Sequence, residues 1–184
     1  GIVAGDDAGS ASYVRLKEKA AGEAGLRSEM TRLSQDVTQK DLLTRIKALN
    51  ERRDVHGIFV QLPLPRGVDE NPVLEAVLPS KDVDGFHPMN IGRSWLGQPS
   101  FVPATPAAVV EMLRRYGYDD LSGRHIVIVN VDNLVGKPLA SLLSRESVGA
   151  TVTLCHPDSA DLSHYTEQAD VLVVSVNRPA FITA

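Results

Sequence analysis

The sequence predicts a mixed α/β protein whose second half forms a doubly wound parallel sheet. Short apolar runs alternate with segments of helical periodicity along most of the chain. In the second half the order is strand, helix, strand, helix, strand, and the strands are apolar throughout, which is typical of parallel sheets covered on both faces. Residues 78–103 are rich in proline, glycine and aspartate and lack a clear period. They indicate an inter-domain connection or an active-site loop.

The composition restricts the class of protein. The 184 residues are 43% hydrophobic and 23% charged, which suffices for one large or two small domains. A net charge of −4 argues against a binder of nucleic acid or anionic membranes. No apolar run approaches the roughly 18 residues of a membrane span. The single cysteine, Cys155, fits a reducing, cytoplasmic location. The chain begins at Gly1 without methionine, and we expect both ends to be cut from a longer protein.

The first half contains alternating strand and helix patterns. The expected elements are half a strand at Ile2–Ala4, a helix at 12–20, a helix with the apolar stripe Leu42, Ile46 and Leu49, and a strand at 56–62 bounded by Gly57 and Pro63.

The second half begins with a helix. Thr105 and Pro106 indicate its start, a hydroxyl cap followed by proline in the first turn. Its apolar stripe is Val109, Leu113 and Tyr116, and Gly117 ends it. The elements expected after it are a strand at 126–129, a helix at 135–142, a strand at 150–155, a short helix at 162–169 and a strand at 171–174.

Tyr13 and Lys17 are four residues apart, so on a helix they share a face. A tyrosine beside a lysine can carry acid–base chemistry, but an amphipathic surface helix with an extended lysine has the same pattern. Short-chain dehydrogenases use this spacing after a glycine-rich nucleotide turn. Here the pair precedes the nucleotide-like strand, which argues against that class.

Two further polar positions stand out. Gln61 ends an apolar strand, where a side chain points into the crevice that binds ligands in parallel sheets, although a satisfied polar residue at a strand end looks the same. Asp82, Asp84 and Gly85 predict a turn in which aspartates cap backbone amides and glycine adopts a positive φ. A metal site needs more clustered oxygen ligands or paired histidines, so we expect no metal site.

Taken together, these segments resemble the bifunctional methylenetetrahydrofolate dehydrogenase/cyclohydrolase family. The resemblance spans nearly the whole chain and implies two domains, an α/β folate-site domain at 1–100 and a Rossmann-like NAD(P)-binding domain at 101–184. Family members extend further at both ends, and the sequence stops before the family's glycine-rich carboxyl-terminal signature. The matching segments are GDD (5–7), SYVRLKEKA (12–20), ALNERRDVHGIFVQLPLP (48–65), KDVDGFHPMNIGR (81–93), FVPATP (101–106), VGKPLASLL (135–143) and TVTLCH (151–156).

The resemblance implies oxidation of 5,10-methylenetetrahydrofolate with NAD(P) and hydrolysis of the methenyl product to 10-formyltetrahydrofolate. Lys17 matches the lysine of the hydrolytic step, and Gln61 matches the glutamine that contacts it. Tyr13 matches the tyrosine that shapes the folate slot, and Asp84 matches the aspartate that hydrogen-bonds the pterin. Tetrahydrofolate derivatives are the implied ligands and a homodimer the implied assembly. The alternative is a cyclohydrolase alone, or a folate-binding protein that has lost catalysis.

The loops expected to bind the cofactor depart from the family. Asn130, Val131 and Asp132 replace Gly-Arg-Ser, Asp158 lies where the family often has arginine, and Asn177 replaces a glycine. With Gly136 and His156 these residues form the expected cofactor site.

Either these loop changes are tolerated or they alter the site. NADP is the family norm, but Val131 supplies no cation for its 2′-phosphate, and Asp132 and Asp158 would repel that group. Carboxylates accept hydrogen bonds from the ribose hydroxyls of NAD. We therefore expect NAD or weak binding, unless Lys137 or Arg178 holds the phosphate.

Overall fold

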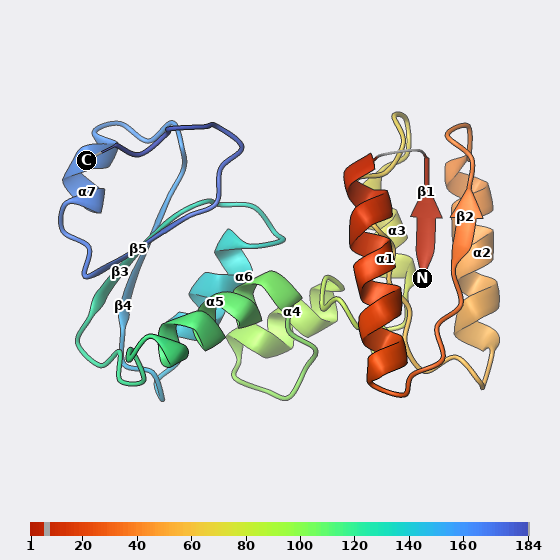
Figure 1. Ribbon diagram of the computed structural model, residues 1–184, viewed down its shortest axis with the longest axis horizontal. Coiled ribbons are helices and arrows are strands. Elements are labelled where there is room, and N and C mark those ends of the chain that lie inside the picture. The colour runs from red at the N-terminus through yellow and green to blue at the C-terminus, as the bar shows by residue number, and fades with distance from the viewer. Residues whose placement is uncertain (6–7, 184) are drawn as a thin grey trace. The chain divides into compact units, whose positions relative to one another are not determined.

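The computed structural model describes residues 1–5 and 8–183, and the chain divides into two compact units, Gly1–Pro88 and Met89–Ala184 (Figure 1). The division lies before the expected boundary at residue 100. Helix α4 (Pro88–Trp95) packs within the second unit, where the Ser94 hydroxyl lies 2.9 Å from the Ser141 hydroxyl of helix α6 (Gly136–Leu143). Both units mix helices and strands, as an α/β protein requires.

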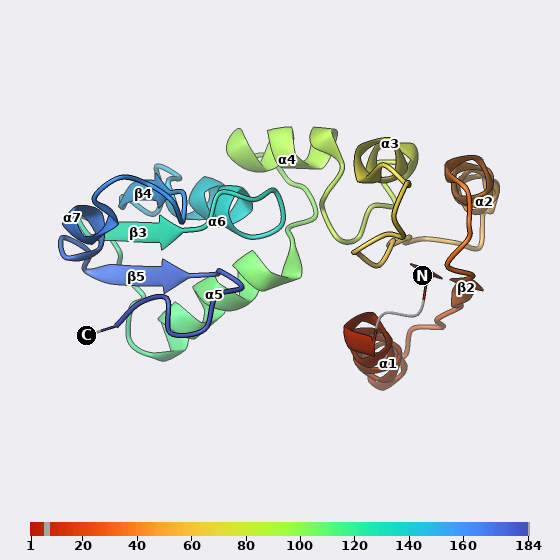
Figure 2. The same cartoon turned by 90° about the horizontal axis from the view of Figure 1, so that it is seen from above.

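In the first unit, strands β1 (Ile2–Ala4) and β2 (Thr31–Leu33) pair in parallel. Helix α1 (Ala8–Glu23) covers one side of these strands, and helices α2 (Gln39–Glu51) and α3 (Glu70–Ala76) cover the other (Figure 2). Strand β2 and helix α3 were not predicted from the sequence, because elements of three and seven residues are too short to establish a period.

The strand expected at 56–62 is reduced to an extended segment at 58–61. Ile2 N donates to Phe59 O over 2.9 Å, and Gln61 N donates to Ile2 O over 2.9 Å. On the other side, Ile58 N donates to Lys81 O over 2.6 Å. The segment therefore lies between β1 and residues 81–83, with isolated bridges at Ile58 and Val60 in place of a regular ladder.

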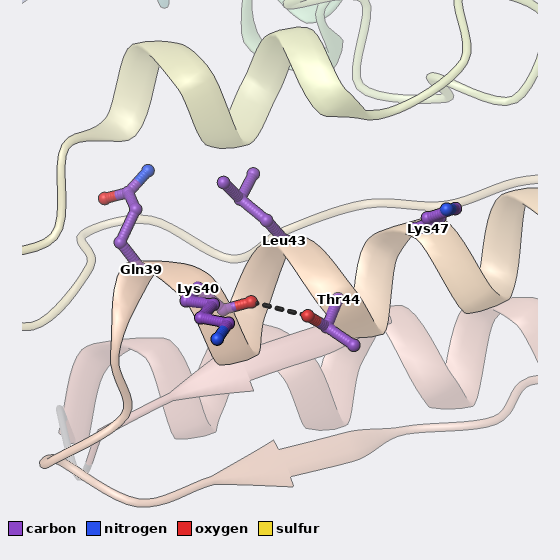
Figure 3. A pocket seen from close by; sticks show the side chains of 5 residues that line it. All are labelled: Gln39, Lys40, Leu43, Thr44 and Lys47. Atoms are coloured by element: carbon purple, nitrogen blue, oxygen red, sulfur yellow. Dashed lines mark hydrogen bonds between the residues drawn. The ribbon is translucent and has the colours of Figure 1, made fainter.

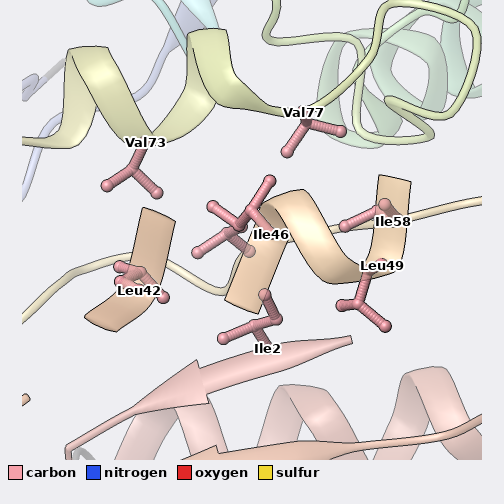
Figure 4. Packing of buried hydrophobic residues seen from close by; sticks show 8 residues of the cluster. Ile2, Leu42, Ile46, Leu49, Ile58, Val73 and Val77 are labelled. Carbon is pink, nitrogen blue, oxygen red and sulfur yellow. The ribbon is translucent and has the colours of Figure 1, made fainter. Parts of the chain in front are cut away.

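The core of the first unit joins β1, α2, α3 and the extended segment. Its residues are at most 7% exposed and are Ile2, Leu42, Ile46, Leu49, Ile58, Val60, Val73 and Val77 (Figure 4). The helical stripe Leu42, Ile46 and Leu49 is confirmed. Since successive side chains of an extended segment alternate in direction, Phe59 and Gln61 point away from this core.

The second unit contains the predicted parallel sheet. Strands β3 (His125–Val129), β4 (Thr151–Cys155) and β5 (Val171–Val174) pair in the order β4-β3-β5. Helix α5 (Ala104–Arg115) and α6 pack against Ile126 and Ile128 on one face. Leu162 of helix α7 (Leu162–Thr166) packs near Val127 and Val129 on the other. Helices on both faces confirm the doubly wound arrangement.

Two details of the second unit differ from expectation. Pro103, not Thr105, occupies the cap position of α5, without a side-chain hydrogen bond. Tyr116 follows the helix and is 82% exposed, so it does not belong to the buried stripe. Gly117 does adopt a positive φ of 86°.

Helix α4 occurs where the sequence indicated a loop. Its buried side chains are Asn90 and Ser94, so the helix packs through polar residues and buries no apolar stripe. Among the described residues, no helix is long and apolar enough to cross a membrane.

Candidate active site

Lys17 of α1 meets two other segments of the first unit. Its Nζ lies 3.2 Å and 3.4 Å from the two carboxylate oxygens of Asp84, and 4.0 Å from the centroid of the Phe59 ring. The side chains of Lys17 and Asp84 are 36% and 19% exposed. A half-buried cation thus lies between a carboxylate and an aromatic face. Phe59 was not among the predicted site residues, although strand alternation places it on the same face as Gln61.

Helix α1 orients Lys17 by burying a neighbour. Val14 is completely buried, whereas Tyr13 is 65% exposed. Tyr13 and Lys17 are one helical turn apart, so the exposed ring of Tyr13 borders the surface that leads to Lys17. Asp6 and Asp7 of the GDD segment lie outside the described residues, while Gly5 N donates to Leu33 O over 3.1 Å.

The two aspartates of the 81–85 turn have different roles. Asp82 is 5% exposed, and its carboxylate accepts hydrogen bonds from the backbone N–H groups of Gly85, Phe86 and His87. Gly85 has a φ of 74°, as the turn prediction requires. The turn interpretation is therefore correct for Asp82, and this turn directs Asp84 toward Lys17.

Burial controls the electrostatics of Asp84. Desolvation raises the pKa of the Asp84 carboxyl above its usual range; the ammonium of Lys17 lowers it by less, and the nearby charge of Asp82 raises it further. The ion pair with Lys17 therefore does not fully compensate for the lost hydration. A carboxylate that is incompletely stabilised is well suited to bind a cation or to accept a hydrogen bond from a donor group of a ligand.

Gln61 does not make the expected contact with Lys17. Its Nε2 donates to the backbone oxygen of Leu62 over 2.9 Å, while the ammonium donates to Asp84. An ionised acceptor competes better for an ammonium than a neutral amide does. The Oε1 of Gln61 is buried and has no hydrogen-bond partner among the described residues. Because buried polar atoms are almost always satisfied, this oxygen is available to a ligand donor.

A shallow hollow on α2 lies apart from this chemistry. Thr44 Oγ1 there donates to Lys40 O over 2.8 Å, and the Gln39 amide exchanges hydrogen bonds with the backbone of Asp69. The residues lining the hollow are Gln39, Lys40, Leu43, Thr44 and Lys47 (Figure 3). None was predicted to carry a function. The described part of the chain also contains no group of three or more His, Cys, Asp or Glu that could hold a metal ion.

In the second unit, the loop between β3 and α6 is closed by its own side chains. Asn130 is 7% exposed, and its Oδ1 accepts from Asp132 N and Gly136 N, each over 2.9 Å. Its Nδ2 donates to Ser175 O over 2.7 Å, which joins the carboxyl ends of β3 and β5. An added Cβ at Gly136 would overlap the backbone and side-chain oxygens of Asn130, so this loop requires glycine there.

Asp132 binds the amides that precede α6. Its Oδ1 accepts from Leu134 N over 2.9 Å and from Val135 N over 2.7 Å. Burial tends to raise the pKa of Asp132, but the hydrogen bonds from Asn130, Val135 and Leu134 outweigh it and lower the pKa overall. The N–H donors at the start of α6 that could bind a phosphate are therefore already occupied, those just before the helix by the Asp132 carboxylate and that of Gly136 by Asn130 Oδ1.

The remaining predicted cofactor residues are exposed or partly exposed. His156 Nδ1 accepts from Asp158 N over 3.0 Å, and Asp158 Oδ1 accepts from Arg178 over 2.9 Å. The Arg178 guanidinium lowers the pKa of Asp158. Val131 is partly buried and Asn177 is exposed. Lys137 Nζ donates to Asn133 Oδ1 over 2.7 Å, so both cations considered as phosphate ligands already have partners.

Comparison with known proteins assigns a family to each unit. Residues 1–84 match the catalytic domain of tetrahydrofolate dehydrogenase/cyclohydrolase, and residues 103–184 match its NAD(P)-binding domain. The bifunctional protein FolD of Streptococcus agalactiae is 47% identical over 182 residues, which are 99% of this chain and 63% of the relative. The chain thus spans less than two thirds of the length of such relatives.

Solved structures agree with this match. The bifunctional FolD of Campylobacter jejuni is 44% identical, with a TM-score of 0.89 over 95% of this chain and 61% of that one. The Trypanosoma brucei enzyme, solved with NADP and an inhibitor, is 34% identical, with a TM-score of 0.92 over 98% of this chain and 61% of that one.

The raised pKa of Asp84 predicts how the stability of the first unit depends on pH. The folded protein holds this proton more tightly than the unfolded chain, whose value is near 3.8. Its contribution to the free energy of unfolding is therefore complete below that value and is lost as pH rises through the folded pKa. The asparagine in the variant Asp84→Asn cannot titrate. The free energy of unfolding of the wild type minus that of the variant should therefore decrease as pH rises from below 3.8 through the folded pKa of Asp84.

Urea unfolding at a series of pH values measures this difference. Asp36→Asn, at an exposed aspartate of the same unit, is the control and should show no such decrease. A difference that increases with pH would contradict the account, because the ion pair with Lys17 would then outweigh burial.

Proposed function

The chain belongs to the tetrahydrofolate dehydrogenase/cyclohydrolase family, and we propose that its first unit hydrolyses methenyltetrahydrofolate while its second unit binds a nicotinamide dinucleotide for oxidation of methylenetetrahydrofolate. The protein acts on tetrahydrofolate derivatives as a homodimer, as the family membership implies. The observation that carries the proposal is the half-buried contact between Lys17 and Asp84.

Hydrolysis of the methenyl group requires proton transfer. Water adds to the cationic carbon and loses a proton, and a ring nitrogen must gain a proton before its bond to that carbon breaks. Lys17 Nζ is the group that moves protons. Asp84 holds the ammonium by two hydrogen bonds, and its carboxylate also favours a cationic ligand beside it. The unpaired Oε1 of Gln61 accepts a hydrogen bond from the folate or from the attacking water.

Oxidation makes a different demand on the protein. The methylene carbon lies between two nitrogens, whose lone pairs expel hydride without an acid or a base. The nicotinamide, when bound, accepts that hydride. The protein must therefore align the two molecules, and the exposed ring of Tyr13 contributes a flat surface beside Lys17 for the folate.

The residues of the second unit fit a ribose better than a phosphate. Asp132 occupies the amides before α6, and the carboxylate of Asp158 already pairs with Arg178. A 2′-phosphate would have to displace these carboxylates against charge repulsion, whereas ribose hydroxyls can donate to them. We therefore propose that NAD is preferred over NADP and that its pyrophosphate is bound weakly.

Lys17→Met tests the hydrolytic site. Methionine keeps the apolar length of the side chain but carries no proton, so hydrolysis of methenyltetrahydrofolate should fall by the roughly 10²–10⁴-fold that acid–base catalysis contributes. Folate binding should remain. Absorbance of the methenyl group follows the reaction, and calorimetry measures binding. Lys19→Met, at a 73% exposed lysine of the same helix, is the matched control and should hydrolyse at the wild-type rate. Near-normal hydrolysis by Lys17→Met would refute the assignment.

Dehydrogenase turnover at matched NAD and NADP concentrations tests the cofactor proposal. Wild type should prefer NAD. Asp158→Asn removes a charge and frees Arg178, so it should shift the preference toward NADP. Asp161→Asn makes the same charge change at an exposed aspartate that does not pair with Arg178, and should not shift it. A wild-type preference for NADP, or no turnover with either cofactor, would rule out the NAD site.

A further inference from the structure

The Phe59 ring contacts the cation of the proposed hydrolytic site. We propose that Phe59 is a positioning residue whose ring face holds the Lys17 ammonium and sets the pH range over which Lys17 exchanges protons. The distance of 4.0 Å from Nζ to the ring centroid is well within the range of a cation–π contact. The inference rests on the proposed role of Lys17 in hydrolysis.

The ring is held in place from several directions. The Phe59 carbonyl accepts from Ile2 N, and the neighbouring Ile58 and Val60 are each 2% exposed in the core. The ring edge also lies against the start of β1, since a Cβ added at Gly1 would come within 2.5 Å of Phe59 Cζ. The backbone and the packing therefore fix the position of the ring relative to Lys17.

The ring and Asp84 act on the ammonium in different ways. The carboxylate accepts hydrogen bonds and can compete for a transferred proton. The ring attracts the cation through its quadrupole and offers no oxygen acceptor, so it stabilises the ammonium without binding the proton that must be moved. Because Lys17 is only 36% exposed, water weakens this attraction less than it would at the surface.

Other charged groups also face Lys17 or its partner. Asp84 lies on the 81–84 segment, and Asp82 lies close enough to it to affect its charge. On α1 the neighbouring titratable side chains are Tyr13 and Glu18. All of these groups are unchanged when only the Phe59 ring is altered, so a shift between such variants reports the ring alone.

The test uses variants that separate the ring's charge distribution from its shape. Phe59→Leu and Phe59→Met remove the ring but keep apolar bulk, and trifluorophenylalanine at position 59 keeps the shape but weakens the negative face. Carbon NMR of labelled lysines gives the titration midpoint of the Lys17 ammonium, assigned through its loss in Lys17→Met. The exposed Lys19 is the internal control.

We expect all three replacements to lower the Lys17 midpoint by about half a pH unit relative to wild type. The limb of the hydrolysis pH–rate profile governed by Lys17 should move by the same amount, and the Lys19 midpoint should not change. An unchanged Lys17 midpoint in the folded trifluorophenylalanine protein would overturn the inference, whether or not the leucine and methionine variants fold. The NMR midpoint requires no turnover. A wild-type protein that does not hydrolyse methenyltetrahydrofolate would therefore refute the proposed function separately.

Discussion

The extended segment 58–61 determines the geometry of the first unit. Its hydrogen bonds to β1 and to residues 81–83 fix its direction, and the alternation of its side chains fixes its two faces. Ile58 and Val60 enter the core beneath α2 and α3, so Phe59 and Gln61 must point to the opposite face. A shift by one residue would exchange the core residues and the site residues. The core and the site are therefore specified by the same backbone register.

In each unit, the backbone of a turn or loop fixes the position of a carboxylate in the candidate site. In the first unit, Asp82 accepts hydrogen bonds from three backbone amides, and the resulting turn leaves Asp84 facing Lys17. In this position the Asp84 carboxylate loses part of its hydration, which raises its pKa. In the second unit, Asp132 caps the amides before α6 and has a lowered pKa. These two carboxylates thus differ in proton affinity, because Asp84 is desolvated and Asp132 is surrounded by N–H donors.

The sequence predicted the elements whose apolar pattern is long and regular, such as the stripe Leu42, Ile46 and Leu49 and the buried strand β3. It did not predict α4, which is short and packs through Asn90 and Ser94 rather than through a buried apolar stripe. The resemblance selected Lys17 and Asp84, but not their mutual contact. That contact depends on the three-dimensional position of the 81–85 turn, as does the capping of the β3–α6 loop by Asp132, and neither follows from local residue patterns.

The central claim is that Lys17 and Asp84 act as one unit in hydrolysis of methenyltetrahydrofolate. A double-mutant cycle tests it most directly, with hydrolysis measured for wild type, Lys17→Met, Asp84→Asn and the double variant. Residues that act together give strongly non-additive losses. The account predicts that the double variant is no slower than the slower of the two single variants. Losses that multiply fully in the double variant would show that the two residues act independently, and would contradict the account.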